Sequence, residues 1–126
     1  MSLKTPLGAA RGLGSAKNGT HHWIMQRITA IALVPLTIWF VLSAIALAGG
    51  GYAEASAWLA RPLNAVLMLL LVAATFHHLQ LGLQVVIEDY VHGEGAKIAA
   101  LLAVKLAAVA LGVAAAFAVL KVAFTV

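Results

Sequence analysis

The amino-acid sequence predicts an all-α membrane protein with three transmembrane helices, and two observations support that fold class. Of the 126 residues, 63% are hydrophobic and only 10% are charged, which is more apolar surface than a soluble domain of this size can bury. The apolar residues fall into three runs, each as long as the ~20 residues that a helix needs to cross a bilayer. Strands are not expected, because an open sheet leaves backbone groups unpaired in lipid and the alternation typical of a barrel is not seen.

The three runs predict the limits of the elements. We expect helices at about residues 22–48, 63–88 and 96–125. Together they form a transmembrane anchor domain over residues 21–126, preceded by a basic, glycine- and alanine-rich segment at residues 1–20.

Two connections join the expected helices. The first, GGGYAEASAWLARP at residues 49–62, predicts a turn-rich loop with a short amphipathic piece, in which aromatic residues suit the membrane interface. The second, EDYVHGEGAK at residues 88–97, predicts a tight polar turn.

Basic residues indicate the orientation of the helices. Four of them lie before or at the start of the first helix: Lys4, Arg11, Lys17 and Arg27. The first loop carries only Arg61, and the second carries Lys97. By the positive-inside rule, the N-terminus and the second loop are cytoplasmic and the C-terminus is periplasmic. The start of the first helix and the end of the second therefore share the cytoplasmic face.

Charge and cysteine content exclude several classes of function. The net charge is +4, but the basic residues are dispersed, so the clustered basic face of a nucleic-acid-binding protein is absent. The chain has no cysteine, which excludes disulfides, thiolate chemistry and iron–sulfur ligation by this chain. The expected surroundings are a lipid bilayer and other membrane subunits.

Two adjacent histidines, His77 and His78, lie inside the second apolar run. His78 precedes Asp89 by eleven residues, which places it ~16 Å below the interface. An ionisable residue at that depth is a functional candidate, and neutral imidazole is a good axial ligand for haem iron. Gly82 lies one turn later on the same face and leaves room for a flat macrocycle. The alternative is an imidazole that only hydrogen-bonds a neighbouring helix.

A haem bound by His78 needs a second axial ligand from elsewhere. The other histidines, His21, His22 and His92, are interfacial by the expected topology, and His77 points about 100° away around the helix. A six-coordinate haem therefore requires a histidine of a partner protein, so the sequence predicts a hetero-oligomer. His77 is expected to pack against a helix or to support the ligand.

Polar residues near the cytoplasmic face form the second group of candidates. Arg27 is either a snorkelling anchor or an anion clamp for haem propionates, and His21 could donate to the same group. Tyr90 could donate a hydrogen bond to a quinone carbonyl, and Asp89 could position a neighbouring group or relay protons. The alternative for both is ordinary polarity at a helix end.

Two motifs resemble a known family. NGTHHWIMQRITAIAL contains NG-x-H followed by R-x-T-A, and HHLQLGLQVVIEDY contains H-x-x-x-G followed by D-Y. Their order and spacing resemble those of the D-type membrane-anchor subunit of succinate dehydrogenase, respiratory complex II. The similarity covers the chain from about residue 17 onward, although the third helix contributes only hydrophobicity.

The resemblance implies roles at the matching positions. His78 corresponds to the axial ligand of haem b. His21 and Arg27 correspond to residues that approach the haem propionates. Tyr90 corresponds to the tyrosine that hydrogen-bonds ubiquinone, and Asp89 to the acid beside it.

The resemblance also implies partners and a place in the cell. The partners are a flavoprotein subunit, an iron–sulfur subunit and a second, C-type anchor that shares the haem, all at the bacterial inner membrane. The chain would perform no chemistry alone and would act in an enzyme only as part of the complex. Two alternatives remain: a fumarate reductase anchor, and a packing or assembly subunit without a cofactor.

Overall fold

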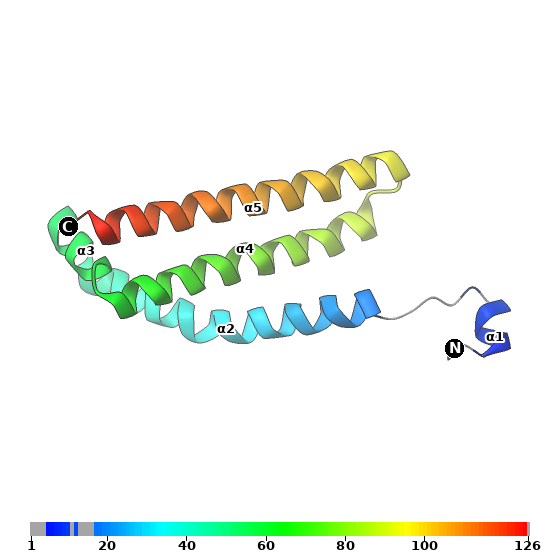
Figure 1. The fold of residues 1–126 in the computed structure, drawn as a ribbon, viewed down its shortest axis with the longest axis horizontal. Helices are drawn as coiled ribbons and strands as arrows, with labels where there is room; N and C mark the ends of the chain where they lie inside the picture. The colour runs from blue at the N-terminus through cyan, green and yellow to red at the C-terminus, as the bar shows by residue number, and fades with distance from the viewer. Residues whose placement is uncertain (1–4, 11, 13–16, 126) are drawn as a thin grey trace.

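The computed structural model describes residues 5–10, 12 and 17–125, and these residues contain no strand. The helices are α1 (Pro6–Ala10), α2 (Lys17–Leu47), α3 (Tyr52–Leu59), α4 (Pro62–Tyr90) and α5 (Glu94–Phe124) (Figure 1). Of these, α2, α4 and α5 are long and apolar enough to cross a membrane. The predicted fold class is therefore confirmed. Lys4 and Arg11, which contributed to the orientation prediction, lie outside the described residues.

The membrane helices are longer than the apolar runs within them. With 31 residues in α2 and α5 and 29 in α4, each is roughly 45 Å long, enough to cross the headgroup layers as well as the hydrocarbon core. This length explains why α2 begins at Lys17 and not near residue 22. The expected division after residue 20 falls inside α2, because polar residues continue the helix into the interface.

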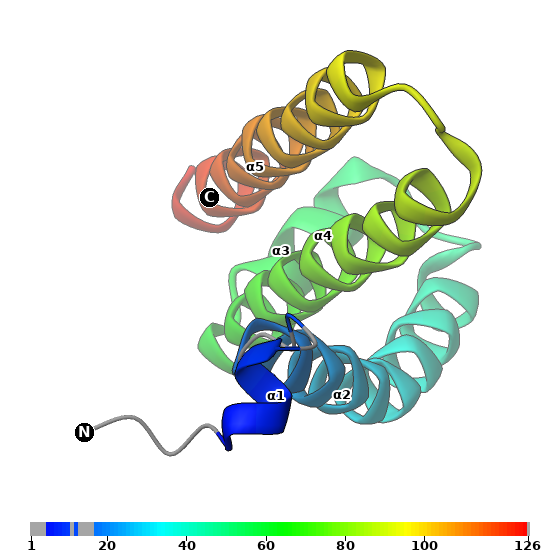
Figure 2. The same cartoon turned by 90° about the vertical axis from the view of Figure 1, so that its right-hand side faces the viewer.

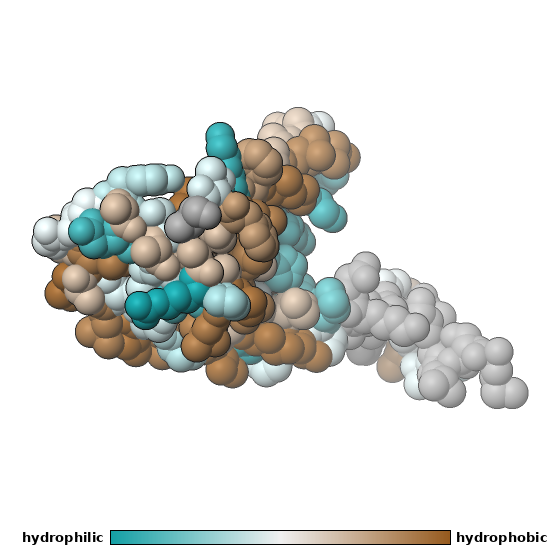
Figure 3. All heavy atoms as spheres, turned by 60° about the vertical axis from the view of Figure 1, so that its left-hand side comes forward, coloured by the Kyte–Doolittle hydropathy of each residue, from teal (hydrophilic) through white to brown (hydrophobic). Residues whose placement is uncertain are grey.

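Helix α4 lies in the middle of the bundle. It packs against α2 and against α5, which lie on opposite sides of it (Figures 1 and 2). Little of the described chain is buried by this arrangement, since Leu81 and Val119 are its only buried hydrophobic side chains. Hydrophobic residues cover much of the surface along the helices (Figure 3). Such a surface suits lipid and other membrane subunits.

One end of the bundle is closed by α3, and we call it the α3 end. The rings of Trp39 on α2 and Trp58 on α3 stack with their centroids 5.3 Å apart. The amide Nδ2 of Asn64 on α4 donates a hydrogen bond of 2.9 Å to the carbonyl oxygen of Trp58. Glu54 accepts a 2.7 Å bond from the backbone N–H of Gly51 at the start of α3. The first two contacts join α3 to α2 and to α4, and the third caps the start of α3.

Candidate functional site

The opposite end brings together the start of α2, the end of α4 and the start of α5 (Figure 1). We call it the Tyr90 end. It carries three of the five residues singled out from the sequence: His21, Asp89 and Tyr90. All three are exposed, and Tyr90 is 76% exposed. Arg27, expected near the same face, is also exposed but lies further along α2, which begins at Lys17.

Arg27 lies well inside α2 and not at its first turn. Ten residues separate it from Lys17, so it is about 15 Å into α2. Its guanidinium carbon is 5.4 Å from the ring centroid of Trp23, one turn closer to the Tyr90 end. A cation–π contact of this kind holds the charge on the surface of the bundle. Arg27 makes no hydrogen bond to another described residue, so its donors can bind an anion.

His78 is held by a hydrogen bond across the helices. Its ring nitrogen Nδ1 lies 3.0 Å from the hydroxyl oxygen Oγ1 of Thr29 on α2. Thr29 is buried, and His78 is half-buried. Within the described part of the chain, Nε2 of His78 has no hydrogen-bond partner, so this nitrogen can bind another group. His78 precedes Tyr90 by twelve residues, which sets it about 18 Å from that end.

A second histidine also joins α2 to α4. The Nε2 of His22 lies 3.2 Å from the carbonyl oxygen of Leu81, and because a carbonyl only accepts, the imidazole donates this bond. The neighbouring His21 is exposed and makes no such contact among the described residues. Sequence reasoning assigned a role to His21 and none to His22, because the contact of His22 with α4 depends on the rotation of α2 against α4.

Gln26 lies between these two hydrogen bonds on α2, and Gly82 follows Leu81 directly on α4. A Cβ atom added to Gly82 would meet only the Nε2 of Gln26, at 3.8 Å, which is ordinary van der Waals distance. The Oε1 atom of Gln26 is buried and has no hydrogen-bond partner among the residues described. One stretch of the α2–α4 contact therefore concentrates polar groups. We call it the polar seam, and its residues are His22, Gln26, Thr29, His78, Leu81 and Gly82.

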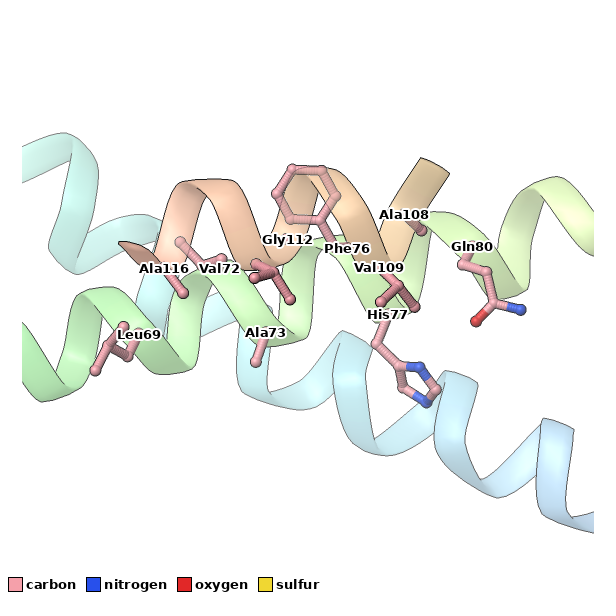
Figure 4. A pocket seen from close by; sticks show the side chains of 11 residues that line it. Leu69, Val72, Ala73, Phe76, His77, Gln80, Ala108, Val109, Gly112 and Ala116 are labelled. Atoms are coloured by element: carbon pink, nitrogen blue, oxygen red, sulfur yellow. The ribbon is translucent and has the colours of Figure 1, made fainter. Parts of the chain in front are cut away.

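The surroundings of His77 differ from those of His78. It is half-buried and lines a groove of about 280 Å³ between α4 and α5, together with Phe76 and Gly112. Figure 4 shows Phe76 and His77 leaving α4 in different directions. His77 also borders a second hollow, against Ile28 and Thr29 of α2. This agrees with a packing role, and it distinguishes His77 from the hydrogen-bonded His78.

The donor set of the chain limits the metal chemistry that it can support alone. No three histidine, cysteine, aspartate or glutamate side chains of the described residues gather as a metal site. A single imidazole with one nitrogen free can instead serve as one axial ligand of a haem. Gly82, one turn from His78, has no side chain of its own, and an added Cβ would meet only the flexible Gln26 side chain, so a flat group beside that imidazole would meet no other obstacle at this position.

Comparison with known proteins identifies relatives over most of the chain. Residues 1–119 match the family model described as the succinate dehydrogenase/fumarate reductase transmembrane subunit. The succinate dehydrogenase hydrophobic membrane anchor subunit of Rickettsia bellii is 40% identical over 97 residues, which cover 77% of this chain and 78% of the relative. The subunit of the same name from Paracoccus denitrificans is 36% identical over 105 residues, covering 82% and 81%. No solved structure matches the chain significantly.

These matches agree with the resemblance found in the two sequence motifs, and they extend it through most of α5. The three helices that are long and apolar enough to cross a membrane agree with a membrane anchor. The chain belongs to the family of succinate dehydrogenase hydrophobic membrane anchor subunits.

Proposed function

We propose that this membrane anchor binds one side of a haem b through His78 and contributes to a ubiquinone-reduction site at the Tyr90 end. The observation that supports the haem role most strongly is the state of the His78 imidazole. Its Nδ1 is bonded to Thr29, and Nε2 is free of hydrogen bonds within the described residues. A half-buried imidazole with one nitrogen fixed and the other available suits an axial ligand.

The remaining haem contacts come from this chain and a companion. Haem supplies one-electron chemistry when it is bound. Arg27 and His21 would bind its propionates, because a guanidinium and an imidazole donate hydrogen bonds to carboxylates. Arg27 supports this role by its depth and its exposed position over Trp23. The second axial histidine would come from the C-type anchor subunit.

The quinone site uses the last residues of α4. Reduction of a quinone adds protons to its carbonyl oxygens, so the site needs a hydrogen-bond donor and a proton source. The phenol of Tyr90 is a donor, and the carboxylate of Asp89 can relay protons. Both are exposed, at a helix end where the lipid-soluble quinone and the soluble subunits can both reach them.

In the complete complex, the flavoprotein and iron–sulfur subunits would dock at the Tyr90 end and pass electrons from succinate to the quinone. The chain catalyses nothing alone. This arrangement requires the Tyr90 end and the N-terminus to face the cytoplasm at the bacterial inner membrane, with the C-terminus periplasmic. Reporter fusions test it: a reporter in residues 91–93 should be cytoplasmic, whereas one in residues 48–51 should be periplasmic. The reverse pattern would overturn the orientation.

The haem role is tested by the adjacent histidines. In the purified complex, His78→Ala should abolish the six-coordinate b-type absorbance spectrum. His77→Ala is the matched control, because it removes the same side chain from the neighbouring position and should leave the spectrum intact. A normal spectrum in His78→Ala would show that His78 is not the ligand. A complex purified from wild type without haem would favour a packing subunit instead.

A fumarate reductase anchor is the second candidate, because the matching family model includes the transmembrane subunits of both enzymes. The relatives' names favour succinate dehydrogenase. The direction of the reaction decides between the two. Faster succinate:ubiquinone reduction than quinol:fumarate reduction by the assembled complex supports the first.

A further inference from the structure

The hydroxyl of Thr29 lies among three polar atoms. Its Oγ1 is 2.7 Å from the carbonyl oxygen of Met25, 3.2 Å from that of Gln26 and 3.0 Å from Nδ1 of His78. A threonine in a membrane helix often bonds the carbonyl four residues earlier, so the Met25 contact alone indicates no special role. The third contact, to another helix, is what distinguishes Thr29.

The donors and acceptors that each group has determine the direction of each of these hydrogen bonds. A hydroxyl has one proton to donate and lone pairs that accept, whereas a carbonyl oxygen only accepts. If the Thr29 proton went to His78, the hydroxyl and Met25 oxygens would face each other at 2.7 Å with no proton between them. The proton therefore lies toward the carbonyls of Met25 and Gln26. The oxygen of Thr29 then accepts, and Nδ1 of His78 must carry a hydrogen.

We propose that Thr29 is a positioning residue for His78: it accepts the Nδ1 proton and thereby fixes the tautomer in which Nε2 is the free, iron-binding nitrogen. This inference rests on the proposed haem-ligand role of His78. In neutral imidazole, one nitrogen carries the proton and the other has the lone pair. With the proton held at Nδ1, the lone pair is on Nε2.

The same bond fixes the orientation of the ring. Thr29 is 6% exposed, so water cannot readily replace His78 as its partner. Rotation of the imidazole by half a turn would put a carbon against the hydroxyl and leave Nδ1–H without its acceptor, which is costly for buried groups. Thr29 and His78 each lie twelve residues from the Tyr90 end of their helices. The bond therefore connects matched depths, about 18 Å from that end.

A hydrogen bond to the proton-bearing nitrogen also changes the ligand itself. An acceptor at Nδ1–H makes the imidazole more basic at Nε2. A more basic ligand stabilises ferric over ferrous iron and so lowers the midpoint potential of the haem. Loss of the hydroxyl should therefore raise the midpoint potential and weaken haem retention, by on the order of 10–100-fold in affinity.

The test compares hydroxyl-deleting and hydroxyl-keeping variants of the assembled complex. Thr29→Val keeps the shape and removes the hydroxyl, whereas Thr29→Ser keeps the hydroxyl and removes the methyl group. Thr37→Val is the matched control, since Thr37 is exposed on the same helix. Haem content per flavin, the redox midpoint and the low-spin ferric EPR signal are measured for each. If Thr29→Val does not assemble, Thr29→Ala is measured in its place.

In Thr29→Val, which lacks the hydroxyl, we expect a higher haem midpoint potential, an altered EPR signal and a lower haem content. Thr29→Ser and Thr37→Val should keep the wild-type values. Wild-type midpoint and EPR values in the deleting variant would overturn it. An equal shift in Thr29→Ser would also overturn it, because the methyl group would then be responsible. His78→Ala distinguishes a failure of this inference from a failure of the proposed function. If haem is lost in His78→Ala but is unaltered in Thr29→Val, only the role of Thr29 is disproved.

Discussion

Polar side chains at the two ends of the bundle differ in whether they are hydrogen-bonded within the chain. At the α3 end, Asn64 and Glu54 are hydrogen-bonded within the chain, and the Trp39–Trp58 stack covers the connection. At the Tyr90 end, Glu88 accepts a bond from Gln84, but Asp89 and Tyr90 have no hydrogen-bond partner among the described residues. Asn64, Glu54 and the two tryptophans of the α3 end thus have partners within the chain, while Asp89 and Tyr90 at the other end are available to other molecules.

The polar seam lies between these extremes. It lies at the contact of α2 with α4, and two hydrogen bonds cross between these helices there, His22 to Leu81 and His78 to Thr29. Yet it leaves one buried oxygen, on Gln26, without a partner in the described part of the chain. The two ends therefore differ more in whether their polar side chains have hydrogen-bond partners within the chain than in how deeply those side chains are buried.

The largest difference between the ends is expected in quinone reduction. Tyr90→Phe removes the proposed donor to the quinone carbonyl and should lower the succinate:quinone activity of the complex by roughly 100-fold. Succinate oxidation with a soluble dye should be unchanged. Tyr52→Phe is the control at the α3 end, because Tyr52 is 73% exposed and Tyr90 is 76% exposed. Equal activities of the two variants would remove Tyr90 from the quinone site.

The next effect concerns stability and should appear at the α3 end. Trp58→Ala removes half of the Trp39–Trp58 stack and should destabilise the subunit by about 2 kcal/mol. The unfolding temperature of the detergent-purified complex reports it. Trp23→Ala is the comparison at the Tyr90 end, and since Trp23 is 60% exposed, its cost should stay within about 0.5 kcal/mol. A larger cost for Trp23→Ala would mean that the Tyr90 end is also structural.

A smaller loss is expected for the hydrogen bond between α4 and α3. Asn64→Ala removes the donor to the Trp58 carbonyl and should cost about 1 kcal/mol. Gln84→Ala, which removes an exposed bond to Glu88 at the Tyr90 end, should cost less, because water replaces an exposed partner. The same thermal measurement ranks the two variants, and the opposite order would contradict the comparison.

The smallest effect is a pH dependence at the start of α3. Hydrogen bonds from the backbone N–H groups of Gly51 and Glu54 lower the pKa of the Glu54 carboxyl from its usual value of 4.5. A lowered native pKa means that the stabilisation is complete above pH 4.5 and is lost as the pH falls through the native pKa. Hydrogen exchange of the Gly51 amide should therefore show less protection at low pH than expected from chemistry alone. Glu54→Gln should show no such loss with pH.

The three membrane helices could be predicted from the sequence because apolar length alone determines which segments cross lipid. The start of α2 at Lys17 could not, since those polar residues give no hydrophobic signal. His78 could be selected by its depth and its spacing from Gly82. Its bond to Thr29 could not, because it depends on how α2 and α4 rotate and cross. The same limit applies to Trp39 and Trp58, which are far apart in the sequence.

The position of α4 between α2 and α5 affects which helices of the subunit can tolerate amino-acid substitutions. The hydrogen bonds of the polar seam join α2 to α4, while α5 packs on the other side of α4. The geometry of the proposed ligand His78 is therefore set by α2 and α4, and α5 can accumulate substitutions that keep its packing without disturbing that geometry. The motifs recognised in the sequence lie in α2 and α4, and none of them lies in α5. The subunit thus divides into a constrained pair of helices and a more tolerant third.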